Sequence, residues 1–231
     1  VLLEPIQGEG GIIVPDDDYL PRVQKLCHKH GALFILDEIQ TGFGRTGKNF
    51  AFEHYGVMPD ILLLGKALGG GVLPVSAILG LKCARFDGDW HDYDVLSCLA
   101  EDGPGEEGST WSGAAISCVA ILAAIKELSD KNLAELAAEN GARFIALLRE
   151  LQARYPRLIT EVRGKGLMVG VDFSIPGRKI SHALMDEGVW AYYTGKDKER
   201  GTVRCGCGSD HHNDPANCPS VLPDPPANNY S

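Results

Sequence analysis

A lysine placed directly after a short apolar run could support covalent chemistry. The run is Ile61 to Leu64, and Gly65 and Lys66 follow it. Such a run is typical of a strand buried on both faces of a parallel sheet, and open α/β sheets bind ligands beyond the carboxyl ends of their strands. Desolvation against an apolar wall favours the neutral amine, which adds to a carbonyl group to give a Schiff base. Lys66 is therefore either the covalent anchor of a carbonyl compound or a solvated lysine at a strand end.

A carboxylate occupies a similar position earlier in the chain. The apolar stretch Ala32 to Leu36 predicts a second buried strand, and Asp37 follows it directly. The carboxyl ends of parallel strands meet at one edge of a sheet, so Asp37 either faces the same ligand as Lys66 or caps a loop. The next segment, Ile39 to Asn49, is too polar for a core and contains Gln40, so it could border a binding site.

Two hydroxyl side chains precede a predicted helix. Ser109 and Thr110 follow a glycine and lead into an apolar segment from Gly113 to Leu128. Hydroxyl residues at this position either cap the helix or bind an anion at its N-terminus, and both interpretations stay open. Because the segment is apolar nearly all round, we expect the helix to be buried.

The elements that must position these residues alternate between strand and helix. Val1 to Ile6 is predicted as a strand, followed by the glycine-rich loop Gln7 to Gly11 and a helix from Pro15 that Gly31 ends. With the strand that comes next, this order is typical of a parallel sheet. Val75 to Leu79 is a further predicted strand, and the polar stretch Lys82 to Gly108 is predicted to be a long surface excursion.

Paired strands replace this alternation from Asn132 onward. Asn132 and Glu135 are placed like a capping box at the start of a long amphipathic helix. The elements predicted after it are strands over 158–162 and 167–173, a helix over 180–187 and a strand over 189–193. We predict an α/β chain with a larger unit over residues 1–131, a smaller α+β unit over 132–194, and an irregular or disordered tail over 195–231.

Composition and charge limit the function classes. The chain has 231 residues and a net charge of −9, which argues against nucleic-acid and anionic-membrane partners. Seven scattered cysteines favour reduced thiols, and the Cys and His residues after Gly201 match no standard zinc spacing, so no metal site is predicted. The sequence begins inside a predicted strand without an initiator Met, and we expect it to be part of a longer protein.

Four motifs in this order closely resemble the class III (ω-amino) aminotransferases, which are fold type I enzymes that carry pyridoxal 5'-phosphate (PLP). The motifs are Glu4-Pro5-Ile6-Gln7-Gly8-Glu9-Gly10-Gly11, Asp37-Glu38-Ile39-Gln40-Thr41-Gly42, Leu64-Gly65-Lys66-Ala67-Leu68-Gly69-Gly70-Gly71 and Gly108-Ser109-Thr110. The resemblance implies part of a PLP-binding major domain and part of a small C-terminal domain. Within the family, Gly71 to Ala77 and Arg163 to Leu167 most resemble the ornithine aminotransferases.

The resemblance implies a role for each motif. Lys66 would hold PLP covalently and later carry the proton between substrate carbon and cofactor. Asp37 would pair with the pyridine nitrogen, and Gln40 is similar to the residue that contacts the ring's phenolic oxygen. Ser109 and Thr110 resemble cofactor-binding residues, with Thr110 reaching the phosphate held by a neighbouring subunit. A homodimer with shared active sites follows from this.

Substrate recognition is implied by two further positions. Glu9 resembles the glutamate that pairs with an active-site arginine in one half-reaction and releases it in the other. Arg204 lies near the place of the family's carboxylate-binding arginine, although the sequence from Cys205 onward is unlike the family. Trp111 follows Thr110 where the family has a different continuation.

The implied reaction moves the δ-amino group of ornithine to 2-oxoglutarate, giving glutamate 5-semialdehyde and glutamate, in the cytoplasm or the mitochondrial matrix. Acetylornithine or 4-aminobutyrate as the amino donor is the alternative within the family. A catalytically silent fragment that keeps the fold and the dimer surface is the alternative outside enzyme function.

Overall fold

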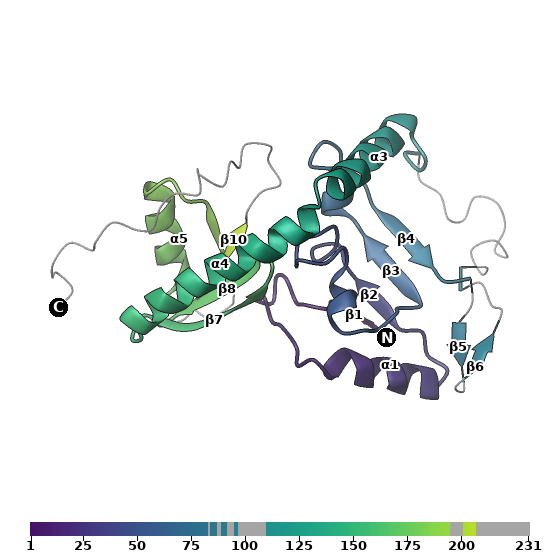
Figure 1. Cartoon of the computed structure of the whole chain (residues 1–231), viewed down its shortest axis with the longest axis horizontal. Helices are drawn as coiled ribbons and strands as arrows, with labels where there is room; N and C mark the ends of the chain where they lie inside the picture. The colour runs from purple at the N-terminus through teal and green to yellow at the C-terminus, as the bar shows by residue number, and fades with distance from the viewer. Residues whose placement is uncertain (83, 87–88, 92–94, 97–109, 195–200, 207–231) are drawn as a thin grey trace.

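The described residues form two four-stranded sheets, which lie side by side along the long axis of the molecule (Figure 1), and one two-stranded sheet. The computed structural model describes residues 1–82, 84–86, 89–91, 95–96, 110–194 and 201–206. The first sheet has the strand order β1-β2-β3-β4, and the second has the order β7-β8-β10-β9. Helix α4 (Leu133–Arg154) runs from one sheet to the other.

The first sheet confirms the predicted strand, helix, strand unit. Strand β1 (Leu2–Leu3) is followed by helix α1 (Tyr19–Lys29) and by β2 (Ile35–Asp37), which pairs with β1 in parallel. β2 starts later than expected because the Ala32 N–H still donates to the Cys27 carbonyl and completes the helix end. Strand β3 (Ile61–Leu64) pairs with β2 in parallel.

The remaining strand of this sheet and its core complete the first unit. β4 (Ala77–Gly80) pairs with β3 in the antiparallel direction. Two 3-10 helices, η1 (Ala51–His54) and η2 (Lys66–Gly69), lie in the connections before and after β3. The core of the unit gathers α1, β2, β3 and the loops around them; its buried members are Leu20, Cys27, Phe34, Leu36, Tyr55, Val57, Leu62, Leu64 and Leu68.

A buried glutamate fixes the loop that follows β2. Glu38 is fully buried, and its carboxylate accepts hydrogen bonds from Thr41 Oγ1 (2.6 Å), the Ala51 N–H (2.9 Å) and the Phe52 N–H (2.8 Å). Burial raises the pKa of the Glu38 carboxyl, and these three hydrogen bonds oppose the shift. The carboxylate therefore ties the end of β2 to the start of η1, as a fully satisfied buried polar group.

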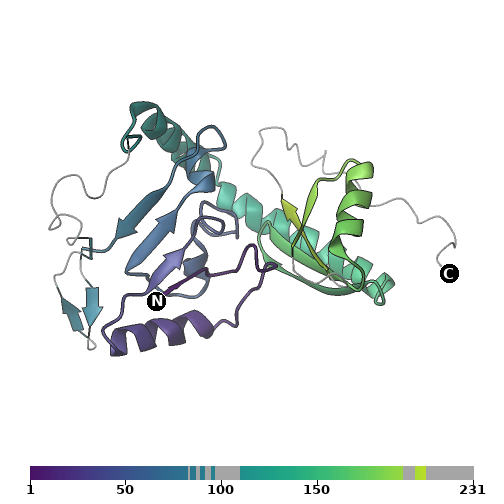
Figure 2. The same ribbon diagram turned by 180° about the vertical axis from the view of Figure 1, so that it is seen from behind.

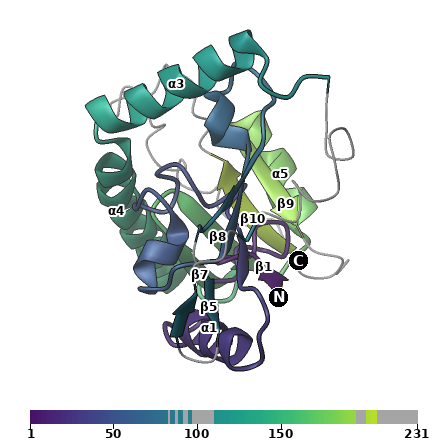
Figure 3. The same ribbon diagram turned by 90° about the vertical axis from the view of Figure 1, so that its right-hand side faces the viewer.

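One expectation for the stretch between β4 and α4 is wrong. Part of the predicted surface excursion forms an antiparallel hairpin of β5 (Ala84–Phe86) and β6 (Asp89–His91). Helix α3 (Ala115–Asp130) has no buried residue, although we expected burial from its apolar composition. It lies at the edge of the molecule (Figure 3), where η2 and the start of α4 contact it. Within the described residues Ile121 of α3 packs against the core of the first unit, whereas Ile116, Val119 and Leu122 are exposed.

The helix-capping prediction at Asn132 is also wrong. Asn132 adopts a left-handed conformation, with φ of 49°, and its side chain makes no capping hydrogen bond to α4. Its N–H instead donates to the Ser129 carbonyl at the end of α3. Asparagine tolerates this backbone conformation and often occupies the position after a helix end. Asn132 therefore lies at the junction of the two helices, where its carbonyl accepts the Leu136 N–H of α4 but its side chain provides no cap.

The second sheet is antiparallel throughout and contains one unexpected strand. Strands β7 (Ile159–Lys165) and β8 (Met168–Phe173) form a hairpin, and helix α5 (Gly177–Asp186) leads to β9 (Ala191–Thr194). Strand β10 (Gly201–Gly206) lies between β8 and β9 and pairs with both. The predicted irregular tail is therefore wrong over residues 201–206, whereas 195–200 and 207–231 lie outside the described residues.

Helices cover one side of the second sheet. On α4, Ile145, Leu148 and Leu151 pack against Val162 of β7 and Val171 of β8. Seen from behind, α5 lies against β9 and β10 (Figure 2). The other face of β8 meets the first unit, where Met168 packs with Ile6 and Ile12.

Glycines allow the two units to approach at backbone distance. The turn between β7 and β8 contains Gly166, where an added Cβ would lie 2.4 Å from the Thr46 carbonyl carbon. Gly141 on α4 faces the same turn, since its Cβ would lie 2.1 Å from the Gly166 oxygen. The Leu167 N–H donates to the Arg45 carbonyl at 2.9 Å. A side chain at Gly166 would force the units apart, and one at Gly141 would push α4 away from the turn.

An ion pair lies on the face of the second sheet that meets the first unit. Arg163 of β7 contacts both carboxylate oxygens of Asp172 on β8, at 2.7 and 3.0 Å. Burial alone would raise the pKa of Asp172, but hydrogen bonds from Arg163 and Thr202 and the charge of Arg163 lower it below its ordinary value. The same partner raises the pKa of Arg163, although burial opposes that shift.

None of the helices in the described part of the chain is long and apolar enough to cross a bilayer.

The lowered pKa of Asp172 predicts an acid-sensitive contribution to stability. The folded carboxyl binds its proton less tightly than the unfolded chain does, so its contribution is present above about pH 3.8 and is lost as the pH falls through the folded pKa. Asp172→Asn should lower the free energy of unfolding by about 1–3 kcal/mol at pH 7. The difference from the natural chain should shrink in urea titrations below pH 3.8.

The exposed Asp130, which pairs with Lys126 on the surface of α3, provides the matched control. Asp130→Asn should change the free energy of unfolding by less than about 0.5 kcal/mol at each pH. An Asp172→Asn deficit that stays constant from pH 7 to pH 3 would contradict the assignment.

Candidate active site

Lys66 lies beyond the end of β3, as the first residue of η2. Its side chain is exposed, and among the described residues it has no hydrogen-bond or ion-pair partner. The Lys66 backbone has φ of 43°, in the left-handed region that residues other than glycine rarely adopt. Such strain is commonly found where a side chain must be presented in one direction. The amine is thus delivered to the sheet edge, available to a ligand.

Asp37 is the last residue of the neighbouring strand β2. In the parallel ladder it pairs with Leu63, so Asp37 and Lys66 come from the same edge of adjacent strands, as the sequence predicts. Asp37 Oδ1 accepts a hydrogen bond from the Ile39 N–H at 2.9 Å. Within the described residues Oδ2 has no partner, and one carboxylate oxygen is available to a donor on a ligand.

Gln40 and Glu9 meet although they are far apart in the sequence. Gln40 Nε2 donates to Glu9 Oε1 at 3.3 Å. The glycine before Glu9 makes this approach possible, because a Cβ on Gly8 would lie 2.0 Å from Gln40 Oε1. The Gly8 N–H donates to the Glu4 carboxylate at 2.8 Å, which fixes the loop at its start. The structure therefore brings together residues from the first two motifs.

The other predicted site residues are placed only in part. Thr110 is an exposed turn residue before α3, and Ser109 lies outside the described residues. Arg204 lies on β10, where its backbone pairs with Gly170 of β8. Gly170 contacts the Glu9 loop, since an added Cβ would lie 3.0 Å from Ile12 Cβ. The register thus places the backbone of Arg204 opposite Gly170, the β8 residue that contacts this loop.

The residues at the strand ends fit the aldehyde and the ring of PLP. A carbonyl compound requires an amine that is free to react, and Lys66 provides one. A pyridine nitrogen that carries a proton requires an acceptor, and the second oxygen of Asp37 is open. Of the residues expected at the phosphate, the structure describes Thr110, whose side chain is exposed. Lys66 and Asp37 therefore match the aldehyde and the ring nitrogen of the cofactor.

No group of three or more His, Cys, Asp or Glu side chains in the described part of the chain is arranged to hold a metal ion. Of the Cys and His residues after Gly201, only Cys205 lies within the described residues, on strand β10.

Sequence reasoning missed three charged residues that support the site. Glu38 belongs to the second motif, yet its position next to Asp37 does not show that it is buried under the following loop. Arg163 lies in a segment noted for its resemblance and Asp172 in a predicted strand, but the sequence does not show that Arg163 binds the glycine loop or that Asp172 pairs with Arg163. The period-two pattern of β7 and β8 could have placed Arg163 and Asp172 on one sheet face. It could not have identified what covers that face.

Comparison with known proteins gives consistent matches. A sequence model described as aminotransferase class-III matches residues 1–206. The putrescine aminotransferase of Pectobacterium atrosepticum is 50% identical over 173 residues, covering 75% of this chain and 34% of that protein. The ornithine aminotransferase of Saccharomyces cerevisiae is 46% identical over 173 residues, covering 74% of this chain and 38% of that protein.

Solved structures agree with the sequence matches. The ornithine aminotransferase of Plasmodium yoelii superposes with a TM-score of 0.76 and 35% identity, covering 88% of this chain and 50% of that chain. This chain thus spans about a third of the two curated relatives and half of the solved structure. Enzymes of this family depend on PLP and have the type I fold, and the family model extends over strand β10 as well. The chain belongs to the class III aminotransferases.

Proposed function

We propose that this chain carries the lysine and aspartate of a PLP-dependent aminotransferase that takes an amino group from the end of a diamine or a basic amino acid. The observation that supports the proposal most is the parallel register of β2 and β3, which brings Asp37 and Lys66 to one edge of the sheet. Membership of the class III family, whose model matches residues 1–206, supports the same reaction class.

The proposed roles follow from the chemistry of the two groups. PLP, when bound, supplies an electron sink for the negative charge that develops on the substrate carbon. Asp37 would hold a proton on the ring nitrogen through its open oxygen, while its other oxygen stays bound to the Ile39 N–H. Lys66 would bind the cofactor covalently, release it to the substrate amine, and then carry a proton with its free amine.

We propose ornithine as the amino donor and 2-oxoglutarate as the acceptor, giving glutamate 5-semialdehyde and glutamate. Two observations support this choice: the identity to the ornithine aminotransferase of S. cerevisiae, and the resemblance of residues 71–77 and 163–167 to ornithine aminotransferases. The P. atrosepticum match favours putrescine as a second candidate donor, because it has the higher identity over the same length. Acetylornithine and 4-aminobutyrate remain the alternatives indicated by the sequence.

Glu9 is proposed to take part in choosing between the two substrates. Its carboxylate is near Gln40, and its loop contacts the strand that pairs with Arg204. An arginine that alternates between Glu9 and a substrate carboxylate would let one site accept both a basic donor and an acidic acceptor. Arg204 is the proposed arginine.

The proposal includes a homodimer in which Thr110 of one subunit reaches the cofactor phosphate of the other, with Ser109 as a further cofactor-binding residue. The exposed position of Thr110 supports its availability to another chain. The expected compartment is the cytoplasm or the mitochondrial matrix, where thiols such as the exposed Cys118 are kept reduced.

The covalent role of Lys66 can be tested directly. The chain should take up PLP with a visible absorbance band that borohydride abolishes, and peptide mapping should find the reduced label on Lys66. Lys66→Ala should remove the band and the label, whereas Lys25→Ala, which changes an exposed lysine of α1, should leave both unchanged. A colourless protein that still dimerises would favour the catalytically silent alternative, and label on another lysine would contradict the assignment.

The role of Asp37 is tested by a change that removes charge and keeps shape. Asp37→Asn retains an oxygen for the Ile39 N–H, so the fold should be preserved. Loss of the charged acceptor should weaken PLP binding or slow turnover by roughly 100-fold. Absorbance titration with PLP measures the effect, and Asp16→Asn, at an exposed position, serves as the control. An unchanged affinity and rate would show that Asp37 does not contact the ring.

The amino donor can be identified by a half-reaction with each candidate. PLP-loaded protein mixed with ornithine, putrescine, acetylornithine or 4-aminobutyrate in turn should lose its visible band fastest with ornithine. We expect a preference of at least about tenfold over the other donors, because buried polar groups discriminate strongly between substrates. A faster reaction with putrescine would identify putrescine, and not ornithine, as the donor. The proposed reaction class would then stay the same.

A further inference from the structure

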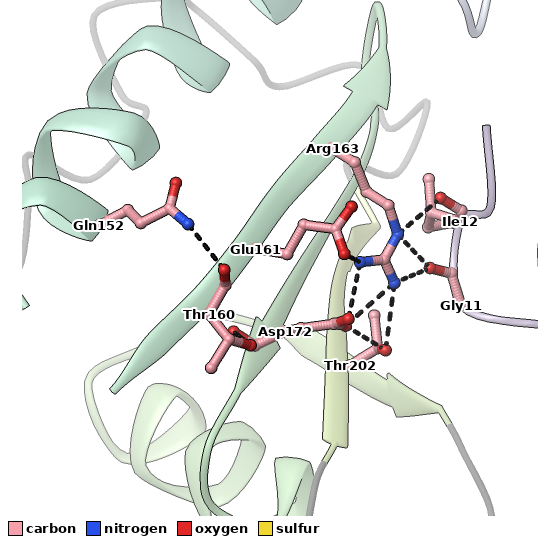
Figure 4. Close-up of polar contacts among 8 residues, drawn as sticks. All are labelled: Gly11, Ile12, Gln152, Thr160, Glu161, Arg163, Asp172 and Thr202. Carbon is pink, nitrogen blue, oxygen red and sulfur yellow. Dashed lines mark hydrogen bonds and ion pairs between the residues drawn. The ribbon is translucent and has the colours of Figure 1, made fainter. Parts of the chain in front are cut away.

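The guanidinium of Arg163 is held on one side by acidic groups of its own sheet. Its side chain is only 12% exposed. Nη1 and Nη2 contact the two oxygens of Asp172, and Nη1 also lies 3.0 Å from Glu161 Oε2 (Figure 4). Thr202 of β10 donates to Asp172 Oδ1 at 2.5 Å. Three strands therefore orient one planar group, which leaves its remaining edge directed out of the sheet.

That edge binds backbone carbonyls of the first unit. Arg163 Nε lies 3.1 Å from the Gly11 oxygen and 3.0 Å from the Ile12 oxygen, and Nη2 lies 2.6 Å from the Gly11 oxygen (Figure 4). Arg163 is separated from these residues by more than 150 positions in the sequence. A charged donor bound to two successive carbonyls fixes both the position and the direction of the loop.

The surroundings are shaped to admit the loop. Gly170 has no side chain, and a Cβ there would lie 3.0 Å from Ile12 Cβ and 3.3 Å from the Gly11 oxygen. Gly11 has φ of 110°, and a Cβ on it would lie 3.2 Å from Thr202 Oγ1. Ile12 is buried with φ of 56°, which is costly for a branched residue. The contacts of Arg163 hold a backbone conformation that the loop would not favour alone.

The loop that Arg163 binds is the one that presents Glu9. Its ends are closed by hydrogen bonds in both directions between Gln7 and Ile13, each 3.1 Å long. Between them the Gly11 N–H donates to the Gly8 carbonyl at 3.1 Å, and Glu9 lies at the turn so formed. A shift of the Gly11 and Ile12 carbonyls that Arg163 binds would therefore move Glu9 away from Gln40.

We propose that Arg163 is a positioning residue that locks the loop Gln7 to Ile13 onto the second sheet and thereby holds Glu9 beside Gln40. The lock can be tested without a cofactor. Its consequence for substrate exchange rests on the proposed function.

Hydrogen exchange of the cofactor-free, full-length chain tests the lock. Arg163→Gln removes the positive charge and the guanidinium donors. The paired variant, Arg163→Gln with Asp172→Asn, also removes the negative charge of the carboxylate that would otherwise lose its partner. In both proteins the amides of residues 7–13 should exchange roughly tenfold faster or more, because charged hydrogen bonds to the loop are lost. The amides of β8 should change less than threefold in the paired variant. Arg22→Gln, at an exposed arginine of α1, should change neither segment.

The outcomes separate positioning from general stability. Faster exchange confined to residues 7–13 supports the lock. Unchanged exchange at residues 7–13, or equal acceleration in β8 and the loop of the paired variant, overturns it. Failure of Arg163→Gln alone to fold leaves the paired variant to decide between these results.

A spectroscopic readout connects the lock to the site. If the chain takes up PLP, the paired variant should alter the absorbance spectrum of the bound cofactor, since Gln40 would lose its contact with Glu9. Arg22→Gln should leave the spectrum unchanged. A natural chain that binds no PLP would refute the proposed function but not the lock, which the exchange measurement decides. An unaltered spectrum in a variant whose loop exchanges faster would refute the link to Glu9.

Discussion

The parallel pairing of β2 with β3 is the constraint on which the candidate site depends. Asp37 pairs with Leu63, so the last residue of one strand lies beside the end of the next. The strands are held there by a shared apolar core, in which Leu36, Leu62 and Leu64 are buried. A shift of the register by one residue would exchange the buried and exposed faces of either strand. The relative placement of Lys66 and Asp37 is therefore as stable as the core.

Much of this region could be predicted from local sequence. Apolar runs before Asp37 and Lys66 predicted the two strands, and the helix between β1 and β2 implied that they run in parallel. Strand β2 starts later than predicted because the chain completes α1 with a backbone hydrogen bond at Ala32. Local patterns contain the information for such elements, since the partners are consecutive in the chain.

Contacts between distant residues could not be predicted in the same way. The sequence at Asn132 is typical of a helix start, but the backbone conformation of Asn132 is set by the end of the preceding helix α3. Strand β10 is short and is followed by a polar segment, and only its pairing with β8 and β9 makes it part of a sheet. The apolar side chains of α3 predicted burial, but burial also depends on what packs against the helix. Ile116 and Leu122 are 68% and 67% exposed in the described chain.

The two units are joined by directional contacts more than by apolar area. The buried apolar cluster at the junction comprises Ile6, Ile12 and Met168, which is small beside the core of the first sheet. Backbone contact at Gly166 fixes the separation of the units, whereas the hydrogen bonds of the Arg163 guanidinium to the loop fix their orientation. Hydrogen bonds and close backbone contacts tolerate little sliding, unlike apolar surfaces.

This form of junction suits a site whose residues come from both units. Small rotations of the second sheet would change the distance between the β10 backbone at Arg204 and the Glu9 loop before they exposed much apolar surface. The apolar core would therefore oppose such a rotation weakly, and the polar contacts at the junction must do so instead. We infer that the partly buried ion pair of Arg163 with Asp172 serves geometry, because an ion pair removed from water contributes little net stability compared with apolar residues of similar size.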